Sequence, residues 1–396
     1  MRIRLKDAFD LQMGKTPARN TPSYWDGDHK WISIADIGSA GKYIATTKER
    51  ITDKAITESG IRAVPEHTVI MSFKLSIGKT AITSEEMYTN EAIMAFISNG
   101  TYAIDTDYLY HLCCGTAWTE GTNKAVMGLT LNKATLSKKR ISLPEITEQR
   151  NIAAKFDALD NVIEKTQSEL SSLDQLVKSR FVEMFGLPGT DAHGWGMSSL
   201  GEICEINPKK SQDARLTNGL LVSFVSMPSV SESGDIDTTQ VKPYDEVKTG
   251  FTYFAENDVL FAKITPCMEN GKGAVATGLY NGIGFGSTEF HVLRPAKETA
   301  TPCWIYTLTV FPQFRIDAAS NMTGSAGQRR VPASFLENYR VSVPPLELQN
   351  RFAAFVAEVD KSKFRIQKSL STSRKLWTMA QIDAIMNMDF STQRSL

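Results

Sequence analysis

The chain carries one passage twice. It reads SLPEITEQRNIAAKFDALD from Ser142 and SVPPLELQNRFAAFVAEVD from Ser342, a constant 200 positions later, and no gap is needed to align the two. An internal repeat at a constant offset indicates that one structural unit occurs twice in the fold. Identical pairs at this offset include Leu136/Leu336, Arg140/Arg340, Pro144/Pro344, Gln149/Gln349, Ala153/Ala353 and Asp160/Asp360. The sequence therefore predicts a duplicated architecture.

A long amphipathic helix is predicted after each proline, because apolar residues recur at alternating steps of four and three. In the first copy these residues are Ile152, Phe156, Leu159, Ile163, Leu170, Leu173, Val177 and Met184, with Thr166 as a polar gap. In the second copy they are Phe352, Val356, Val359, Ile366, Leu370, Trp377 and Ala380, interrupted by Lys363 and Ser373. We expect the two helices to pair along these seams. The alternative is two unrelated amphipathic helices in separate cores.

The first of these helices has recognisable ends. It is expected to begin near Ser142–Thr147, where the sequence resembles a capping box, and to end at Gly186, which is followed by Leu-Pro-Gly. A helix over residues 147–185 would be roughly 58 Å long at ~1.5 Å per residue.

The segments before the two helices also echo each other. LKDAFDLQMGKTP from Leu5 parallels LGEICEINPKKSQ from Leu200, and SGIRAVPEHTVIMSFK from Ser59 parallels TGFTYFAENDVLFAK from Thr249. These runs cluster Val, Ile, Phe and Tyr between Gly, Asn and Asp, which is typical of short strands joined by turns. The predicted order is globule, long helix, globule, long helix.

Composition fits this plan and excludes several classes of protein. The chain has 396 residues, 42% of them hydrophobic and 22% charged, which favours a soluble protein of two or more domains. No apolar run is long enough to span a membrane, and MRIRLKDAFD lacks the apolar core of a secretory signal. The five cysteines form no C-x-x-C pair, which favours reduced thiols in the cytosol. The net charge of zero excludes only a uniformly positive surface.

With these features in view, the chain resembles the specificity subunits of type I restriction–modification systems over essentially its full length. The best-matching stretches are LPEITEQRNIAAKFDALD and PPLELQNRFAAFVAEVD, supported by YWDGDHKWISIADI (Tyr24–Ile37) and TGSAGQRRV (Thr323–Val331). The sequence departs from the family pattern at Ile146, where Leu is common, and at Leu348, which replaces Glu.

The resemblance implies an α+β fold in which two similar β-rich α/β target-recognition domains are separated by two long antiparallel coiled-coil helices. The implied segments are residues 1–145 (target-recognition domain 1), 146–186 (spacer helix 1), 187–345 (target-recognition domain 2) and 346–396 (spacer helix 2). Each domain would read one half of a bipartite double-stranded DNA sequence. The helices would set the spacing and dock two methyltransferase subunits, which a restriction/translocase subunit then joins. The implied location is the cytoplasm.

No catalytic constellation is found in the sequence. Gly78-Lys79-Thr80 lacks the first glycine of a phosphate-binding loop, because Phe73 stands there. GIGFGS at Gly282 is interpreted as a turn, and the five histidines show no i, i+4 pair or cysteine cluster typical of a metal site. We therefore expect a non-catalytic chain without cofactor or metal, with S-adenosylmethionine, ATP and Mg²⁺ on partner subunits only. Two alternatives are an enzyme with a drifted motif and a coiled-coil adaptor whose globules bind proteins.

Candidate DNA-binding residues come from polar loop segments, because Lys and Arg contact phosphates while Arg, Gln and Asn suit base edges. In the first domain they are Lys15, Thr16, Arg19, Tyr24, Lys30, Lys74, Lys79, Asn123 and Lys124. In the second they are Lys209, Lys210, Lys263, Lys272, Gln328, Arg329 and Arg330. As a set, most are expected on one concave basic face.

A second set of candidates lies near the helix starts. These residues are expected to be exposed and to contact the methyltransferase subunits, because two similar surfaces can bind two copies of one partner. They are Gln149, Arg150, Lys155 and Gln349.

Overall fold

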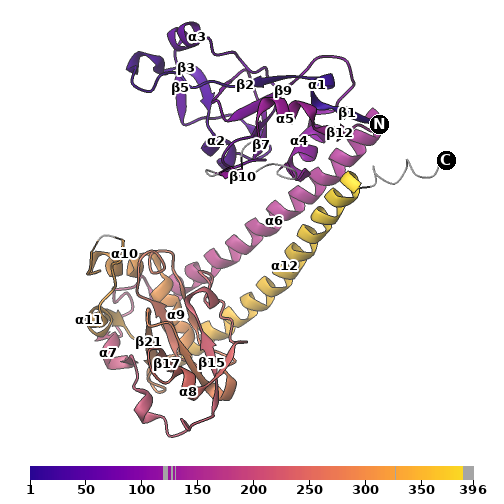
Figure 1. Ribbon diagram of the computed structural model, residues 1–396. Coiled ribbons are helices and arrows are strands. Elements are labelled where there is room, and N and C mark those ends of the chain that lie inside the picture. Colours follow the sequence, from indigo (N-terminus) through magenta and orange to yellow (C-terminus); the bar gives the residue numbers. More distant parts are fainter. Residues whose placement is uncertain (119–123, 126–127, 130, 326, 387–396) are drawn as a thin grey trace, which may run out of the picture. The chain divides into compact units, whose positions relative to one another are not determined.

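The computed structural model describes residues 1–118, 124–125, 128–129, 131–325 and 327–386 (Figure 1). The chain forms two compact units. Unit 1 contains Met1–Gln167 and Lys368–Leu396, and unit 2 contains Ser168–Gln367. This division differs from the four predicted segments because each unit includes part of both long helices. The target-recognition boundaries stay a prediction.

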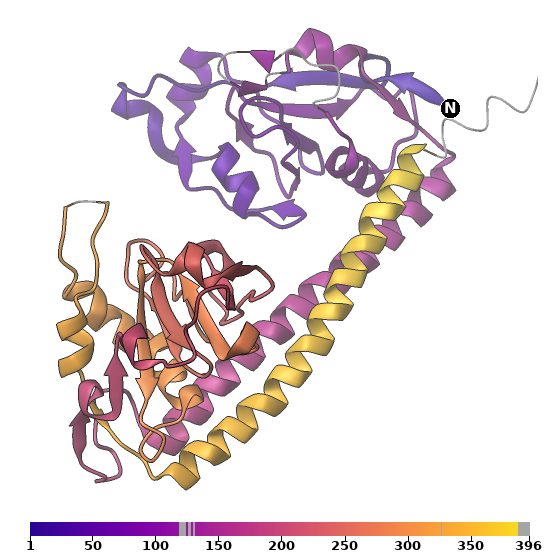
Figure 2. The same ribbon diagram turned by 60° about the horizontal axis from the view of Figure 1, so that its bottom comes forward.

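The two long helices are α6 (Ile146–Phe185) and α12 (Leu346–Met386). In unit 1 the rings of Phe156 and Trp377 lie 6.0 Å apart. In unit 2 the ring of Phe352 lies 5.6 Å from that of Phe181 and 5.3 Å from that of Phe185. Both views show α6 and α12 side by side (Figures 1 and 2). The predicted pairing is confirmed. The pair is antiparallel, because Phe156 near the start of α6 meets Trp377 near the end of α12, whereas Phe181 near the end of α6 meets Phe352 near the start of α12.

Two of the three polar interruptions of the seam have partners of their own. Thr166 is buried, and its hydroxyl donates to the Val162 carbonyl at 2.6 Å. The Lys363 ammonium lies 2.5 Å from Asp174 on the facing helix. The other predicted seam residues with described side chains are buried or half-buried. Helix α6 stops at Gly186, whose φ of +79° is the left-handed conformation that glycine adopts without strain.

Unit 1 is built from short strands and helices before α6. In chain order they are β1 (Arg2–Arg4), α1 (Leu5–Ala8), β2 (Phe9–Met13), η1 (Pro22–Tyr24), β3 (Trp25–Ile32), α2 (Ile34–Ser39), β4 (Tyr43–Ile44), β5 (Glu49–Ile51), α3 (Asp53–Ser59), β6 (Val69–Ser72), β7 (Thr80–Thr83), β8 (Tyr88–Thr89), β9 (Ile93–Ser98), α4 (Thr106–Gly115), β10 (Lys124–Ala125), β11 (Gly128–Leu129), α5 (Lys133–Lys138) and β12 (Arg140–Ser142).

Unit 2 repeats this series between the two long helices. Its elements are β13 (Met197–Ser199), α7 (Leu200–Ile203), β14 (Cys204–Ile206), η2 (Lys210–Gln212), β15 (Leu221–Val225), η3 (Met227–Ser229), β16 (Val241–Pro243), α8 (Tyr244–Val247), β17 (Thr252–Ala255), β18 (Val259–Ala262), β19 (Gly273–Val275), η4 (Tyr280–Gly282), β20 (Ile283–Gly286), β21 (Phe290–Pro295), α9 (Pro302–Val310), α10 (Pro312–Ser320), α11 (Ala333–Asn338) and β22 (Arg340–Ser342).

The strand orders show that the two globular parts share a common set of strands, to which unit 1 adds β4 and unit 2 adds β17. The larger sheet of unit 1 has the order β2-β9-β6-β7-β4, and unit 2 has β14-β21-β18-β19. The second sheets are β5-β3-β8 in unit 1 and β16-β15-β20-β17 in unit 2, each with one parallel pair, β3 with β8 and β15 with β20. Each globule is closed by its first strand pairing with the strand just before a long helix, β1 with β12 and β13 with β22. The faint sequence echo is thus a true structural repeat.

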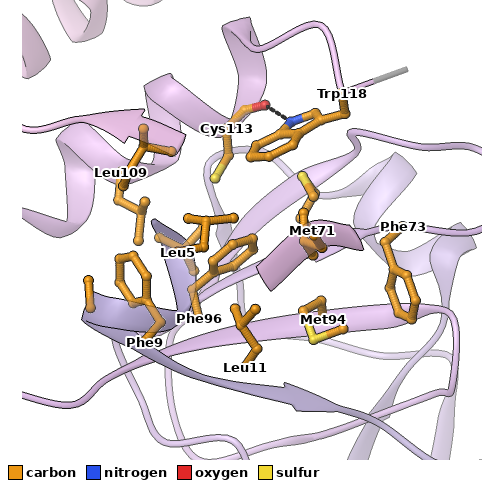
Figure 3. Packing of buried hydrophobic residues seen from close by; sticks show 14 of the residues in the cluster. Leu5, Phe9, Leu11, Met71, Phe73, Met94, Phe96, Leu109, Cys113 and Trp118 are labelled. Atoms are coloured by element: carbon orange, nitrogen blue, oxygen red, sulfur yellow. Dashed lines mark hydrogen bonds between the residues drawn. The ribbon is translucent and has the colours of Figure 1, made fainter. Parts of the chain in front are cut away.

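Apolar side chains fill the space between the helices and one sheet of each unit, the sheet of β2 in unit 1 and the sheet of β14 in unit 2. Figure 3 shows this core in unit 1, where Phe9 and Phe96 meet edge to face at 5.7 Å and Trp118 donates to the Cys113 carbonyl at 2.8 Å. The core cluster extends onto α6 through Ala153. In unit 2 the equivalent cluster takes in residues of both long helices. Helix α6 is therefore part of both cores, and α12 is part of the core of unit 2.

One expected turn is a strand. Residues of GIGFGS form β20, inside the sheet order β16-β15-β20-β17. A Cβ at Gly284 would lie 2.1 Å from the Phe254 ring, and one at Gly286 would lie 2.2 Å from the Val225 carbonyl. The glycines are needed because neighbouring groups approach the strand closely, so the interpretation as a turn was wrong.

Candidate nucleic-acid interface

The first group of candidates surrounds the smaller sheet of unit 1, and its charges are already engaged. Arg19 pairs with Glu49, and its guanidinium lies 4.1 Å from the centre of the Trp25 ring. Lys30 pairs with Glu85 and also donates to the Ala45 carbonyl at 2.7 Å. These contacts hold the segment around Arg19 against β3 and β5.

Two further candidates of this group contact carboxylates through their hydroxyls. Thr16 donates to Glu91, and Tyr24 donates to Glu58 at 2.6 Å. This hydrogen bond raises the pKa of the Tyr24 hydroxyl. A hydroxyl engaged in this way has less capacity to bind a phosphate.

Lys15 and Lys210 occupy equivalent positions and make equivalent contacts. The Lys15 ammonium donates to the carbonyl of Ser59, the last residue of α3. The Lys210 ammonium donates to the carbonyl of Lys248, the C-cap of α8. A cation at a helix C-terminus meets the carbonyls that lack an intrahelical partner. Both lysines therefore have a structural role that sequence inspection missed, although their pairing at an offset of 195 signals it.

The hairpin between β6 and β7 carries the next candidates. Lys74 lies beside the Phe73 ring, with its ammonium 5.2 Å from the ring centre, and Lys79 is exposed. Lys272 takes the place of Lys79 in unit 2, since Ser72 donates its amide to the Lys79 carbonyl and Ala262 to that of Lys272. Asn123 lies outside the described residues, and Lys124 begins β10 with its side chain undescribed.

In unit 2 the structure brings Lys263 and Arg330 close to Glu289. Arg330 makes two hydrogen bonds to Glu289, of 2.9 and 2.8 Å, and this guanidinium holds the pKa of that carboxyl below its usual range. Burial lowers the pKa of the half-buried Lys263 ammonium, with Glu289 opposing and Arg330 adding to the effect. His291 continues this cluster, since its Nε2 lies 2.8 Å from the Val331 carbonyl.

The backbone explains why these residues meet. Lys263 donates its amide to the Glu289 carbonyl at 2.9 Å, and Val331 donates to the Lys263 carbonyl at 2.9 Å. In unit 1 the same bonds involve Phe73, which donates to Ala92 and accepts from Leu131. Lys263 thus stands where unit 1 has a buried phenylalanine, and the alignment that paired it with Lys74 is off by one residue.

The remaining unit 2 candidates lie around this cluster. Arg329 is exposed and 3.6 Å from Glu269, while Thr265 donates its amide to the Arg329 carbonyl at 3.0 Å. Gln328 and Lys209 are exposed, and Lys272 donates to the Met227 carbonyl at 3.2 Å. Several of the candidate cations are thus paired with carboxylates, and the expected concave basic face stays a prediction. DNA contact by any of them stays a prediction.

A buried arginine next to this region was missed by sequence inspection. Arg315 of α10 is buried, donates to the Met268 carbonyl at 2.9 Å and to the Gly271 carbonyl at 3.3 Å, and lies 4.6 Å from the centre of the Phe261 ring. Burial lowers the pKa of its guanidinium to about 10. It supports the loop between β18 and β19 from within. Only the position of Arg315 on an otherwise buried helix face could have signalled this.

The helix-start candidates need a correction. Gln149 and Gln349 were expected to be exposed, but their exposed fractions are 1% and 0%. Gln149 donates to the carbonyls of Ala103 and Pro144 at 3.1 and 2.9 Å, and accepts from the Asp105 amide at 2.9 Å. They are buried because each primary amide satisfies backbone groups that would otherwise be orphaned.

The same glutamine clamp recurs in unit 2. Gln349 donates to the carbonyls of Thr299 and Pro344 at 2.9 and 2.8 Å, and accepts from the Thr301 amide at 2.8 Å. Asp105 and Thr301 are the N-caps of α4 and α9. Each clamp therefore joins the start of a long helix to the start of a helix of the globule.

The two other helix-start candidates are exposed, as expected. The Arg150 guanidinium lies 3.7 Å from Asp105, and Lys155 is open to solvent. Partner contact by these residues stays a prediction.

The described residues contain neither a metal-ligand cluster nor a membrane-spanning helix. Within this part of the chain, no group of three or more His, Cys, Asp or Glu residues could hold a metal ion. No helix of this part is both long enough and apolar enough to cross a membrane.

Comparison with known proteins agrees with the repeat. The family described as type I restriction modification DNA specificity domain matches residues 1–174 and 192–373. The EcoAI specificity subunit of Escherichia coli is 43% identical over 161 residues, and the EcoEI subunit is 42% identical. These matches cover 40% of this chain but only 26% of either relative. The MjaIX specificity subunit of Methanocaldococcus jannaschii is 20% identical over 94% of this chain and 89% of its own.

Solved structures share the fold. One, from a study of complex assembly and conformational transition of the type I R-M system, has a TM-score of 0.58 at 18% identity and covers 97% of both chains. The S subunit from M. genitalium has a TM-score of 0.50 at 13% identity, over 97% of this chain and 96% of its own. Since the family match covers most of the chain as two successive segments, the protein belongs to the type I restriction–modification DNA specificity family.

Proposed function

We propose that this chain is the sequence-reading subunit of a type I restriction–modification complex, in which each unit reads one half of a bipartite double-stranded DNA target. The observation that carries this proposal is the duplicated topology, with equivalent strands in the same order, apart from β4 and β17, and the same glutamine clamp in both units. Two copies of one fold with different loop residues suit two half-sites of different sequence. The paired helices would then fix the separation of the half-sites.

The chemistry in this proposal belongs to partners. The chain directs two methyltransferase subunits and a restriction/translocase subunit, and it has no active site or cofactor of its own. S-adenosylmethionine, ATP and Mg²⁺ would be bound by those subunits. Arg150 and Lys155 are exposed near the start of α6 and are available for docking a methyltransferase subunit. Gln149 and Gln349 no longer belong to this set, because they are buried.

In unit 2 the basic groups around Glu289 are the best candidates for contact with DNA. Arg330 pairs with this carboxylate, which also attracts the Lys263 ammonium, and the exposed Arg329 and Gln328 lie in the adjoining loop. A phosphate that approached Arg330 would compete with Glu289 for the same donors. Arg329 is the stronger candidate for a DNA contact, because its 3.6 Å separation from Glu269 indicates a weaker pair.

Exchange of one domain tests the division of labour. Residues 1–145 are replaced by the equivalent segment of a relative with a different target, and methylated bases are mapped in cells that supply the partner subunits. We expect one half of the methylated sequence to change and the other half to stay. The reciprocal exchange of residues 187–345 is the matched control and should change only the other half. A change in both halves, or in neither, would contradict the proposal.

Binding to the mapped sequence separates DNA reading from a protein adaptor. The assembled complex should bind a duplex containing that sequence, with an affinity that falls steeply as salt rises, because phosphate contacts release counterions. Equal affinity for the target and for a scrambled duplex would favour the adaptor.

A further inference from the structure

The hairpin between β6 and β7 holds an aliphatic residue where the fold gives it no support. Leu75 is 79% exposed, the largest value among the exposed large hydrophobic residues of the described chain. Its φ is +63°. The other non-glycine residues with positive φ in the described part are Asn, Asp or His, which tolerate this conformation better. A strained and solvent-exposed leucine is unfavourable for the isolated fold, which points to a role outside it.

The exposure of Leu75 is set by a well-held loop. Ser72 is completely buried, and its carbonyl accepts from the Gly78 amide at 2.9 Å. Its hydroxyl donates to the Ser76 carbonyl and accepts from the Lys79 amide at 3.1 Å. These hydrogen bonds close the loop at its base and hold Leu75 at the tip.

The neighbours of Leu75 show that the loop sorts its apolar side chains. Phe73 is 1% exposed and lies in the core beside Met94 (Figure 3). Ile77 is partly buried against the same core. Residues 73 and 77 thus point inward while Leu75 points outward. The core thus accepts two apolar residues of this loop. Leu75 is also apolar, and it is exposed because the backbone at this position directs its side chain outward.

The charges beside Leu75 indicate the kind of partner. Lys74 precedes it and Lys79 closes the loop, and in the described residues neither ammonium has a carboxylate within salt-bridge distance. A loop that carries an apolar tip and two lysines without ion pairs matches duplex DNA, where phosphates flank the stacked faces of the bases. Aliphatic side chains that enter duplex DNA act as wedges between base steps. One leucine offers too little apolar area to anchor the chain to a lipid surface.

We propose that Leu75 is a wedge that enters a base step of the half-site read by unit 1, while Lys74 and Lys79 contact the flanking phosphates. This inference rests on the proposed function and names a specificity-determining residue for it. In unit 2 the hairpin at the same topological position holds the exposed Pro266, beside Arg329. The two units would therefore deform their half-sites with different side chains.

The test uses the complex with its methyltransferase partners and a duplex containing the mapped target, with 2-aminopurine placed in turn at each adenine of the unit 1 half-site. Binding of the wild-type complex should raise the fluorescence at one step, because an unstacked 2-aminopurine is brighter. The Leu75→Gly variant should lose this signal and bind about tenfold more weakly, since it lacks the apolar contact. Leu75→Met should keep most of both.

Two further variants separate the wedge from charge and from folding. Leu75→Gly should leave the dependence of affinity on salt unchanged, whereas Lys74→Ala should lower its slope by about 1. Glycine also relieves the strain at positive φ, so the melting temperature of Leu75→Gly should be no lower than that of the wild type. Ile316→Ala removes an exposed apolar side chain from α10 and should change neither the affinity nor the fluorescence.

The outcomes distinguish this inference from the function on which it rests. Sequence-specific binding by the wild type, with no fluorescence change and equal affinity for Leu75→Gly, would overturn the wedge alone. Absence of any sequence-specific DNA binding by the wild-type complex would overturn both. Binding of the wild type to anionic phosphatidylserine vesicles, abolished by Leu75→Gly, would show that the tip meets a membrane instead.

Discussion

Replacement of Gln349 by alanine tests whether the glutamine clamp stabilises unit 2. The side chain is fully buried and takes part in three hydrogen bonds of 2.8 to 2.9 Å. A hydrogen bond contributes roughly 0.5–1.5 kcal/mol net, so three contribute about 3 kcal/mol. The variant also leaves one backbone amide and two backbone carbonyls without their partner in a region that excludes most water. Because water cannot replace the lost hydrogen bonds, the loss of stability should not be much less than this value.

The expected result is a lower melting temperature for the transition of unit 2. For a domain of 150–250 residues, 1 kcal/mol shifts the midpoint by roughly 2–4 °C, so the variant should melt about 6–12 °C below the wild type. Differential scanning calorimetry measures this shift. Gln149→Ala breaks the equivalent clamp and should lower the transition of unit 1 by a similar amount, because its three bonds have similar lengths.

Asn350→Ala is the matched control, since Asn350 is the exposed neighbour of Gln349 on the same turn of α12. It should change the midpoint by no more than about 2 °C, as surface substitutions usually stay within ~0.5 kcal/mol. If Gln349→Ala melted together with Asn350→Ala and the wild type, the clamp would not contribute to stability and the reasoning would fail.

Two other perturbations probe the packing of the helices and the response to acid. Phe352→Ala opens a cavity against two phenylalanines of α6 and should lower the free energy of unfolding of unit 2 by about 3–5 kcal/mol. Urea unfolding measures this loss, and an unchanged midpoint would contradict the helix pairing. Arg215 beside Asp213 holds the pKa of that carboxyl well below its usual range, against the opposing effect of burial. The stabilisation is therefore present above about pH 4 and is lost as the pH falls further, so the melting temperature of unit 2 should decline less steeply between pH 4 and pH 2.5 in Asp213→Asn than in the wild type. Parallel declines in the two proteins would show that this pair does not matter for acid stability.

Local patterns in the sequence were sufficient to predict the two long helices and their pairing. The step of four and three predicted both long helices and their seams, and the ends of α6 at Ile146 and Phe185 lie within one residue of the expected ones. This succeeds because the face that a helix buries is set by a period of 3.6 residues, which a single chain displays directly. The interpretation of GIGFGS failed because these glycines are required by close contacts with Phe254 and Val225, which are distant in the sequence.

The candidate site was less predictable, because the state of a polar side chain depends on residues far away in the chain. Arg19 finds Glu49 thirty positions on, and Arg330 finds Glu289 forty-one positions back. Such pairing removes part of the charge that made these residues candidates for binding DNA. Sequence inspection could identify basic loops, but it could not tell which cations were already neutralised.

The sequence by itself determined that the protein is a duplication with two paired heptad helices, since repetition and periodicity are written in neighbouring residues. Only the tertiary structure decided the roles of particular side chains. Gln149 and Gln349 became internal clamps because the N-terminus of a second helix comes to lie against each of them. Leu75 became an exposed tip because hydrogen bonds from Ser72 close the loop beneath it. Both outcomes depend on contacts that form only after the chain has folded.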